Sequence, residues 1–224
     1  MKVWVYIDGF NLYKGRLQGT PYKWLDLLKL SQALLPNDQV DYVKYFSAKV
    51  DARAGDPDQP LRQIAYWQAL RTLPQIEIIE GHFLSKTTLM PDAASVQNLK
   101  DDAANGLNIG GQKPMMVEVF KSEEKGTDVN LATHLVNDAH LKRFEAALIV
   151  SNDSDLNEAV RIVKNEIGLT VGVFSPHPNR PSVQLKATAS FFREIKPSHL
   201  KTNQFPPILT DVSGNILATK PVAW

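Results

Sequence analysis

Short apolar runs alternate along the chain with segments in which apolar residues recur every three or four positions. The runs have the length and the β-branched or aromatic composition of buried strands, and the spaced segments have the period of amphipathic helices. The runs predict strands over residues 3–7, 42–48, 76–84, 115–120, 146–150 and 169–174. The spaced segments predict helices over residues 24–35, 61–72, 128–140, 155–166 and 182–194. This alternation indicates an α/β fold with a mainly parallel sheet of about six strands and helices on both faces.

Two segments fall outside this alternation. Residues 85–113 are rich in Ser, Asn, Asp and Gly, and we expect them to form a long flexible loop. Residues 196–224 contain several prolines and are expected to form a tail that packs on the body or on a partner. The sequence therefore predicts one α/β domain over residues 1–195, followed by this tail.

Composition excludes several classes of site and of protein. The chain has no cysteine, which excludes disulfides, thiolate zinc sites and a cysteine nucleophile. The five histidines show no metal-ligand spacing, and we expect them to be structural or on the surface. No apolar run approaches the roughly 18 residues that span a bilayer, and the start of the chain lacks a signal-peptide pattern. We therefore expect a cytoplasmic protein without a membrane segment.

Four aspartates lie where a predicted strand ends or a predicted helix begins. Asp8 follows the first strand, Asp153 and Asp155 follow the strand over 146–150, and Asp128 opens a helix. Because the carboxyl ends of parallel strands meet at one edge of a sheet, these carboxylates are expected to converge there. Hard oxygen ligands of this kind suit Mg²⁺ or Mn²⁺.

Each aspartate also has an explanation without a metal, since Asp is a preferred residue at turns and at helix N-termini. The joint pattern favours a metal site, because neutral polar groups lie beside the carboxylates and could contact them or a substrate. These neutral candidates are Asn11, Thr127, Ser151 and Ser154. Net charge is only +1, but Lys14, Lys44 and Lys125 could hold flanking phosphates of a nucleic acid. Phe10, Tyr13 and Tyr22 could stack on unpaired bases, although core packing is the more common role for any one of them.

Three motifs in order resemble the NYN domain family, which includes the LabA-like proteins and is related to the PIN-domain nucleases. They are Ile7-Asp8-Gly9-Phe10-Asn11-Leu12, Lys125-Gly126-Thr127-Asp128-Val129 and Ser151-Asn152-Asp153-Ser154-Asp155-Leu156. The resemblance covers about residues 1–195. It implies a three-layer PIN-like, or Rossmannoid, sandwich. Many relatives have Gly at the position of Asn152, and we expect Asn152 to supply the left-handed backbone of that glycine.

The resemblance also implies a function. It makes Asp8, Asp128, Asp153 and Asp155 the metal-binding and catalytic residues of a ribonuclease that depends on Mg²⁺ or Mn²⁺. Asn11, Thr127, Ser151, Ser154, Lys14 and Lys125 become the candidate substrate contacts. The implied partner is RNA, with single-stranded DNA as the alternative, and related domains often form homodimers.

Three other classes compete with the nuclease. A phosphatase of the haloacid-dehalogenase type needs Asp-x-Asp after the first strand, and this chain has Asp8-Gly9-Phe10. A nicotinamide enzyme is disfavoured because no Gly-x-Gly-x-x-Gly follows that strand. A non-catalytic RNA-binding or regulatory module that keeps the acidic pocket stays open as the alternative.

Overall fold

The computed structural model describes residues 1–53 and 55–224, and these divide into two compact units. The first unit comprises residues 1–82 and 125–224, and the second comprises residues 83–124. Strands β3 and β4 belong to both units, because each crosses the boundary between them.

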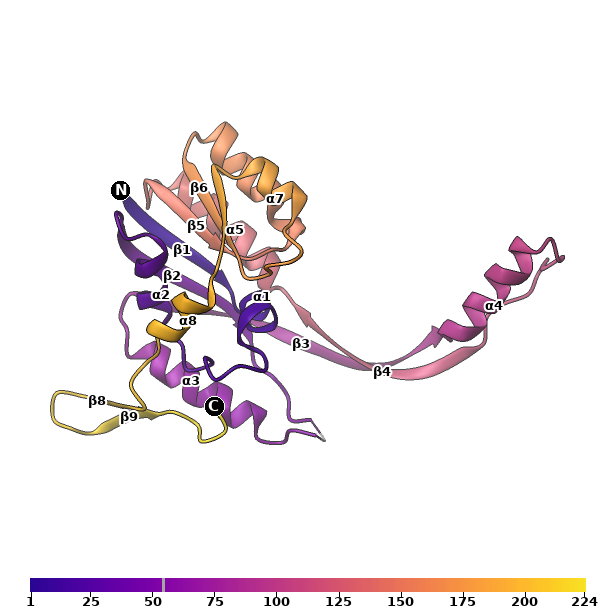
Figure 1. The fold of residues 1–224 in the computed structure, drawn as a ribbon, viewed down its shortest axis with the longest axis horizontal. Helices are drawn as coiled ribbons and strands as arrows, with labels where there is room; N and C mark the ends of the chain where they lie inside the picture. The colour runs from indigo at the N-terminus through magenta and orange to yellow at the C-terminus, as the bar shows by residue number, and fades with distance from the viewer. Residues whose placement is uncertain (54) are drawn as a thin grey trace. The chain divides into compact units, whose positions relative to one another are not determined.

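A seven-stranded sheet runs through the fold in the order β4-β3-β2-β1-β5-β6-β7 (Figure 1). Its strands are β1 (Lys2–Asp8), β2 (Gln39–Ala48), β3 (Ile76–Pro91), β4 (Met116–Lys125), β5 (Ala146–Val150), β6 (Thr170–Ser175) and β7 (Phe191–Glu194). The pairs from β3 through β7 are all parallel. The predicted α/β class and the mainly parallel sheet are confirmed, with one strand more than the six expected.

Helices cover both faces of the sheet in the first unit. One face carries α1 (Gly9–Leu12), the π-helical turn η1 (Tyr13–Leu17), α2 (Leu27–Leu34), α3 (Gln59–Arg71) and α8 (Pro197–Thr202). The other face carries α5 (Thr127–His140), the 3-10 turn η2 (Ser154–Leu156), α6 (Asn157–Arg161), the π-helical turn η3 (Ile162–Glu166) and α7 (Val183–Thr188). The two layers of helices bury separate apolar clusters, so β1 and β5 are covered on both sides and every residue of β5 is buried. This is the three-layer sandwich that the sequence pattern predicts.

The expected helix over 182–194 is wrong in its second half, because α7 ends at Thr188 and β7 begins at Phe191. Phe191 pairs with Gly172 on β6, and its ring lies where a side chain on Gly172 would be, at 2.0 Å from an ideal Cβ. Gly172 thus leaves room for the ring of Phe191 over β6, which allows the short edge strand β7 to pair with β6.

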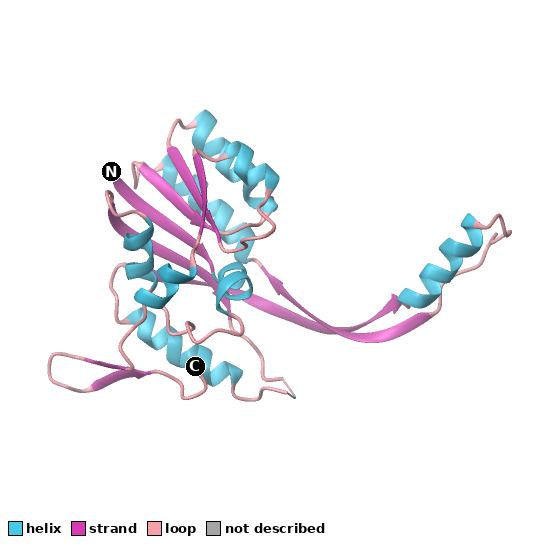
Figure 2. Cartoon of the chain, in the orientation of Figure 1, coloured by secondary structure: helices cyan, strands magenta, loops and turns pink. Residues whose placement is uncertain are grey.

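The second unit consists of the outer parts of β3 and β4 with α4 (Ala93–Ala104) between them (Figure 2). The expected loop over 85–113 is therefore wrong as an assignment of secondary structure, since β3 continues to Pro91 and a helix follows at once. Asp92 caps that helix by accepting a hydrogen bond from the backbone N–H of Ser95 at 2.8 Å. No residue of α4 is buried, although Val96, Leu99 and Ala103 recur at helical spacing and line a shallow pocket. The flexibility of this segment stays a prediction.

Residues 196–224 form α8 and a hairpin of β8 (Ile208–Thr210) and β9 (Ile216–Thr219), and they pack in the first unit. The Nε1–H of buried Trp24 donates to the backbone oxygen of Pro206 at 2.8 Å. The ring of Trp224 lies 6.3 Å from that of Trp24 and 5.9 Å from that of Tyr66. The tail therefore contributes to the core of this unit. Within the described residues, no helix has the length and apolarity needed to cross a bilayer.

Candidate functional site

Asp8 ends β1 and lies at the start of α1. Its side chain is buried, at 5% exposure, and its Oδ1 accepts a hydrogen bond from the backbone N–H of Asn11 at 2.9 Å. Gly9 permits the close approach of this turn to β2, because a Cβ at Gly9 would lie 2.8 Å from the backbone oxygen of Phe46. The strand end and the cap together fix the carboxylate of Asp8 at the carboxyl edge of the sheet.

The turn after β5 lies beside the turn after β1. Ile7 pairs with Val150 in the parallel register, so the two strands end at the same level. Ser151 follows directly and is fully buried. Asp153 then caps η2 by accepting from the backbone N–H of Asp155 at 3.0 Å. The predicted clustering of the two acidic turns at one edge therefore has a basis in the strand register.

Two hydrogen-bond bridges join these turns. The hydroxyl of Ser151 donates to Oδ2 of Asp8 at 3.0 Å and accepts from the backbone N–H of Asp153 at 3.1 Å. Oδ1 of Asn11 accepts from the backbone N–H of Asn152 at 2.9 Å. Asn11 and Ser151 thus position the acidic groups through the backbone and through Asp8.

The backbone of Asn152 does not have the left-handed conformation that we expected from its alignment with glycine in related proteins. Among the described non-glycine residues only Lys142 has a positive φ, so the backbone of Asn152 is not left-handed. Its side chain instead ties the turn to the segment after β6. Oδ1 accepts from the hydroxyl of Ser175 at 3.0 Å and from the N–H of Ser182 at 2.8 Å, and Nδ2 donates to the oxygen of Arg180 at 2.8 Å. The departure from glycine is therefore explained by side-chain hydrogen bonds that glycine could not make.

Asp128 lies in the first turn of α5, after Gly126, which has a φ of 92°, and after buried Thr127. Partial burial raises the pKa of Asp128, and the negative charges of Asp153 and Asp155 raise it further. The contribution of these two charges indicates that Asp128 lies within electrostatic range of the aspartates of the β5 turn. A cation placed among them would relieve the repulsion.

The remaining predicted residues are more open to solvent. Ser154 and Asp155 are exposed on η2, Lys14 is exposed on η1, and Lys125 is exposed at the end of β4. In contrast, Lys44 is 3% exposed and lies in the core, so the prediction that it holds a phosphate is wrong.

The donor set fits a hard divalent cation in its chemistry, since it consists of carboxylates and neutral oxygens. Across residues 1–53 and 55–224, however, no three His, Asp or Glu side chains form a group that could hold one ion. Mg²⁺ commonly binds to one or two carboxylates and completes its shell with water and substrate phosphates. The residues present fit that mode of binding rather than an all-protein cage.

A cavity of about 340 Å³ adjoins this edge. Gly9 and Phe10 line it from α1, Tyr45 lines it from β2, and Tyr66 lines it from α3. The pKa of Tyr45 is raised to about 12, mainly by burial and also by the charge of Asp8. Tyr45 therefore stays protonated at neutral pH between the cavity and the acidic turn.

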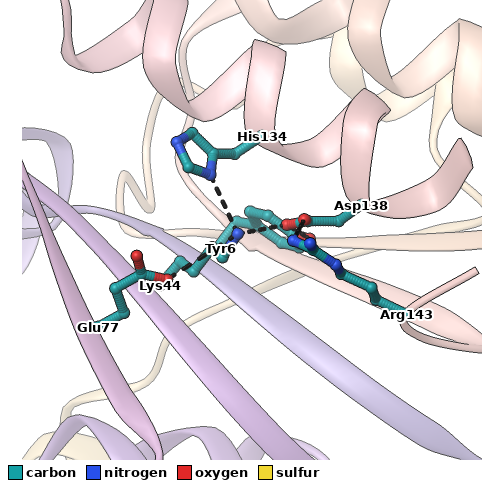
Figure 3. Close-up of polar contacts among 6 residues, drawn as sticks. All are labelled: Tyr6, Lys44, Glu77, His134, Asp138 and Arg143. Atoms are coloured by element: carbon teal, nitrogen blue, oxygen red, sulfur yellow. Dashed lines mark hydrogen bonds and ion pairs between the residues drawn. The ribbon is translucent and has the colours of Figure 1, made fainter. Parts of the chain in front are cut away.

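A buried polar network lies under α5, and sequence reasoning missed it (Figure 3). Asp138 is fully buried, and its Oδ2 accepts from Nζ of Lys44 at 2.6 Å and from the hydroxyl of Tyr6 at 2.8 Å. Its Oδ1 accepts from Nη1 of Arg143 at 2.7 Å, and Nζ of Lys44 also lies 3.0 Å from Nδ1 of His134. The only sequence signal was a lysine at the centre of an apolar strand.

Comparison with known proteins places the chain in a family. The model of the NYN domain matches residues 2–196. This chain belongs to the NYN domain family. The resemblance seen in the three motifs is thereby confirmed, and the nuclease-like fold of the NYN family agrees with the observed sandwich.

Two known proteins similar to this NYN protein extend the comparison. The chain is 31% identical over 245 aligned residues to 6-hydroxy-3-succinoylpyridine 3-monooxygenase HspA of Pseudomonas putida (strain DSM 28022 / S16), covering 98% of this chain and 74% of that protein. A protein of unknown function, VPA0982 from Vibrio parahaemolyticus RIMD 2210633, has a similar structure with a TM-score of 0.54 at 16% identity. That likeness covers 88% of this chain and 93% of the other, and it supports the fold alone.

Proposed function

We propose that this protein is a divalent-metal-dependent ribonuclease of the NYN family. One observation carries the proposal, namely that Ser151 hydrogen-bonds both to the carboxylate of Asp8 and to the backbone of Asp153. Two acidic turns far apart in sequence are thereby held together at the carboxyl edge of a parallel sheet, where ligands bind in open α/β folds. The NYN family membership makes nucleic acid the expected partner.

Each candidate residue has a role in this proposal. Asp8 and Asp153, with Asp128 and Asp155, would bind Mg²⁺ or Mn²⁺. Asn11 and Ser151 hold the turns, and Thr127 and Ser154 lie beside the carboxylates as candidate substrate contacts. The exposed Lys14 and Lys125 would hold phosphates that flank the scissile bond. When bound, a divalent ion would withdraw charge from the scissile phosphate and make an attacking water easier to deprotonate.

Electrostatics support the need for a cation. A substrate phosphate would be repelled by the carboxylates of Asp128, Asp153 and Asp155, since burial and also the charges of Asp153 and Asp155 raise the pKa of Asp128. The proposal therefore requires that cleavage depend strictly on added divalent metal. It places the protein in the cytoplasm, acting on RNA as a monomer or as a homodimer.

The test is cleavage of labelled single-stranded RNA with Mn²⁺, Mg²⁺ or EDTA. We expect cleavage with metal, no cleavage with EDTA, and a loss of at least a hundredfold in Asp153→Asn. Glu158→Gln is the matched control, because Glu158 is an exposed acid on α6 whose partner is Arg161. Equal cleavage by Asp153→Asn and the wild type would overturn the proposal. Metal-dependent RNA binding without cleavage would instead indicate the non-catalytic module.

A second candidate is hydroxylation of a small aromatic ring, and it rests on the relative named as a monooxygenase, which is 31% identical over 98% of this chain. The test of this candidate is an assay for consumption of O₂ with 6-hydroxy-3-succinoylpyridine and an added reductant. The nuclease proposal predicts no turnover in this assay. Turnover there, with no cleavage of RNA, would favour the second candidate.

A further inference from the structure

The cavity beside the acidic edge has a wall of aromatic rings. Tyr45 and Tyr66 are buried, and their rings meet edge to face with centroids 6.4 Å apart. The hydroxyl of Tyr66 is held by the backbone oxygen of Leu25 at 2.7 Å, and the ring of Trp224 packs against Tyr66. The wall is therefore fixed before any ligand arrives, which reduces the entropic cost of binding.

Partly exposed rings complete the lining. Phe10 and Tyr13 from the first helical turns and Trp224 from the end of the chain all border the cavity and are half-buried. Rings of this kind offer faces on which a planar heteroaromatic group can stack. A volume of about 340 Å³ lies within the range of small-ligand sites.

The charges at the cavity favour an anion. Lys14, Lys23 and Arg53 line it, and none of them forms an ion pair with the residues that the structure describes. The one acidic side chain in the lining, Asp56, is already paired with the guanidinium of Arg62. Three uncompensated cations thus surround a space with aromatic walls.

We infer that this cavity binds one unpaired nucleotide, with its base against the aromatic wall and its phosphate on Lys14, Lys23 and Arg53. Because Gly9 lines the cavity and directly follows Asp8, the phosphodiester next to the bound nucleotide would reach the acidic edge. The inference rests on the proposed function and deepens it, since it makes the enzyme specific for single strands. A small aromatic acid also combines a planar ring with a negative charge. The experiment distinguishes such an acid from a nucleotide.

The experiment is calorimetric titration of the full chain, without metal, with 5′-AMP, adenosine, inorganic phosphate and nicotinic acid. We expect 5′-AMP to bind at least tenfold more tightly than adenosine or phosphate alone, because ring and charge are both recognised. Nicotinic acid is expected to bind more weakly than 5′-AMP. Tighter binding of nicotinic acid would overturn the nucleotide assignment and favour a small aromatic acid.

Variants localise the binding. Arg53→Gln and Tyr13→Leu should each weaken 5′-AMP binding about tenfold, while Lys201→Gln, an exposed lysine on α8, should leave it unchanged. Circular dichroism checks that the variants fold, and Arg53 is exposed, so its substitution leaves the core intact. Unchanged binding in both variants would overturn the inference.

RNA cleavage separates the two proposals. In a nuclease with this cavity, Arg53→Gln should raise KM for single-stranded RNA several-fold with little change in kcat. If 5′-AMP binds as expected but RNA is not cleaved, the cavity stands and the ribonuclease proposal fails. If RNA is cleaved and the cavity variants change neither binding nor KM, the ribonuclease stands and the cavity assignment fails.

Discussion

Oδ1 of Asn11 accepts a hydrogen bond from the backbone N–H of Asn152 at 2.9 Å. The two residues lie 141 positions apart in the chain, yet this contact joins the helical turn after β1 to the turn after β5. Because Asn152 directly precedes Asp153, we expect Asn11 to position the acidic turn through this backbone contact.

We predict that Asn11→Ala lowers cleavage of RNA more than it lowers stability. The substitution leaves the N–H of Asn152 without its partner, which costs about 1–2 kcal/mol of unfolding free energy. Cleavage should fall at least tenfold, because the turn that carries Asp153 then keeps only the Ser151 bridge to Asp8. Urea denaturation and initial rates give the two quantities. Asn108→Ala, which removes a comparable exposed side chain-to-backbone bond, serves as the control and should change neither.

The raised pKa of Asp128 predicts a stability effect of defined sign. Burial and the charges of Asp153 and Asp155 raise this pKa above its ordinary value of 3.8, so the folded state disfavours the ionised form. At pH 7 the ionised group therefore reduces stability, and this penalty disappears as the pH falls toward 3.8 and Asp128 becomes protonated in both states.

Asp128→Asn should accordingly raise the Tm at pH 7 in EDTA, and the gain should shrink as the pH is lowered. Added Mn²⁺ should stabilise the wild type more than the variant, because a bound cation removes the repulsion. Thermal unfolding followed by circular dichroism measures both effects. A lower Tm for Asp128→Asn at pH 7 would show that Asp128 is not under electrostatic strain.

The buried network predicts a large effect far from the acidic edge. Asp138→Asn leaves Lys44 in the core without its closest anion and should cost about 3–5 kcal/mol. Tyr6→Phe removes one donor to the carboxylate of Asp138 and should cost about 1.5–3 kcal/mol. Asp41→Asn, which affects a solvent-accessible pair with Lys2, should cost less than about 1 kcal/mol. Equal losses in Asp138→Asn and Asp41→Asn, measured in urea, would contradict this ranking.

His134 gives the network a dependence on pH. Burial lowers the pKa of His134 below its ordinary value of 6.5, and the positive charge of Lys44 lowers it further. A lowered folded-state pKa means that the unfolded chain takes up the proton first. The contribution of neutral His134 to stability is therefore present above pH 6.5 and is lost as the pH falls below it.

We expect stability measured between pH 7.5 and pH 5, a range chosen to bracket the ordinary histidine pKa of about 6.5, to fall less steeply in His134→Gln than in the wild type. Glutamine keeps an acceptor for Lys44 but cannot titrate. His82→Gln is the control, because His82 is exposed, and its slope should match that of the wild type. A slope for His134→Gln equal to that of the wild type would show that His134 does not titrate with unfolding.

The central strands and the acidic turns could be predicted from local sequence, because each strand is a short apolar run and each turn follows it directly. The run Ala146–Val150 is buried throughout, and its predicted bounds agree with those of the strand. The edge strand β7 could not be predicted, since its formation depends on Gly172 in another strand. Helix α4 was missed because its short apolar stripe of Val96, Leu99 and Ala103 lies in a segment rich in Ser, Asn and Asp and buries no residue.

The network and the cavity depended on contacts that no local pattern contains. Tyr6, Lys44 and Asp138 come from β1, β2 and α5, and each alone has an ordinary alternative on a protein surface. Trp224 lies in the tail that the sequence separated from the domain, yet it packs on Tyr66 in the cavity wall. Composition indicated basic residues near the acidic edge but could not show which of them are buried.

Helix α5 carries Asp128 in its first turn and Asp138 near its last, ten positions or about 15 Å further along the axis. Because both residues lie on one α-helix, we expect the Lys44–Asp138 ion pair to help hold the first turn of α5, and with it Asp128, in place. Loss of the ion pair at Asp138 would then let Asp128 shift relative to the other aspartates. Substitutions at Asp138 should accordingly be read out in the metal affinity of the acidic edge, as well as in the unfolding curve.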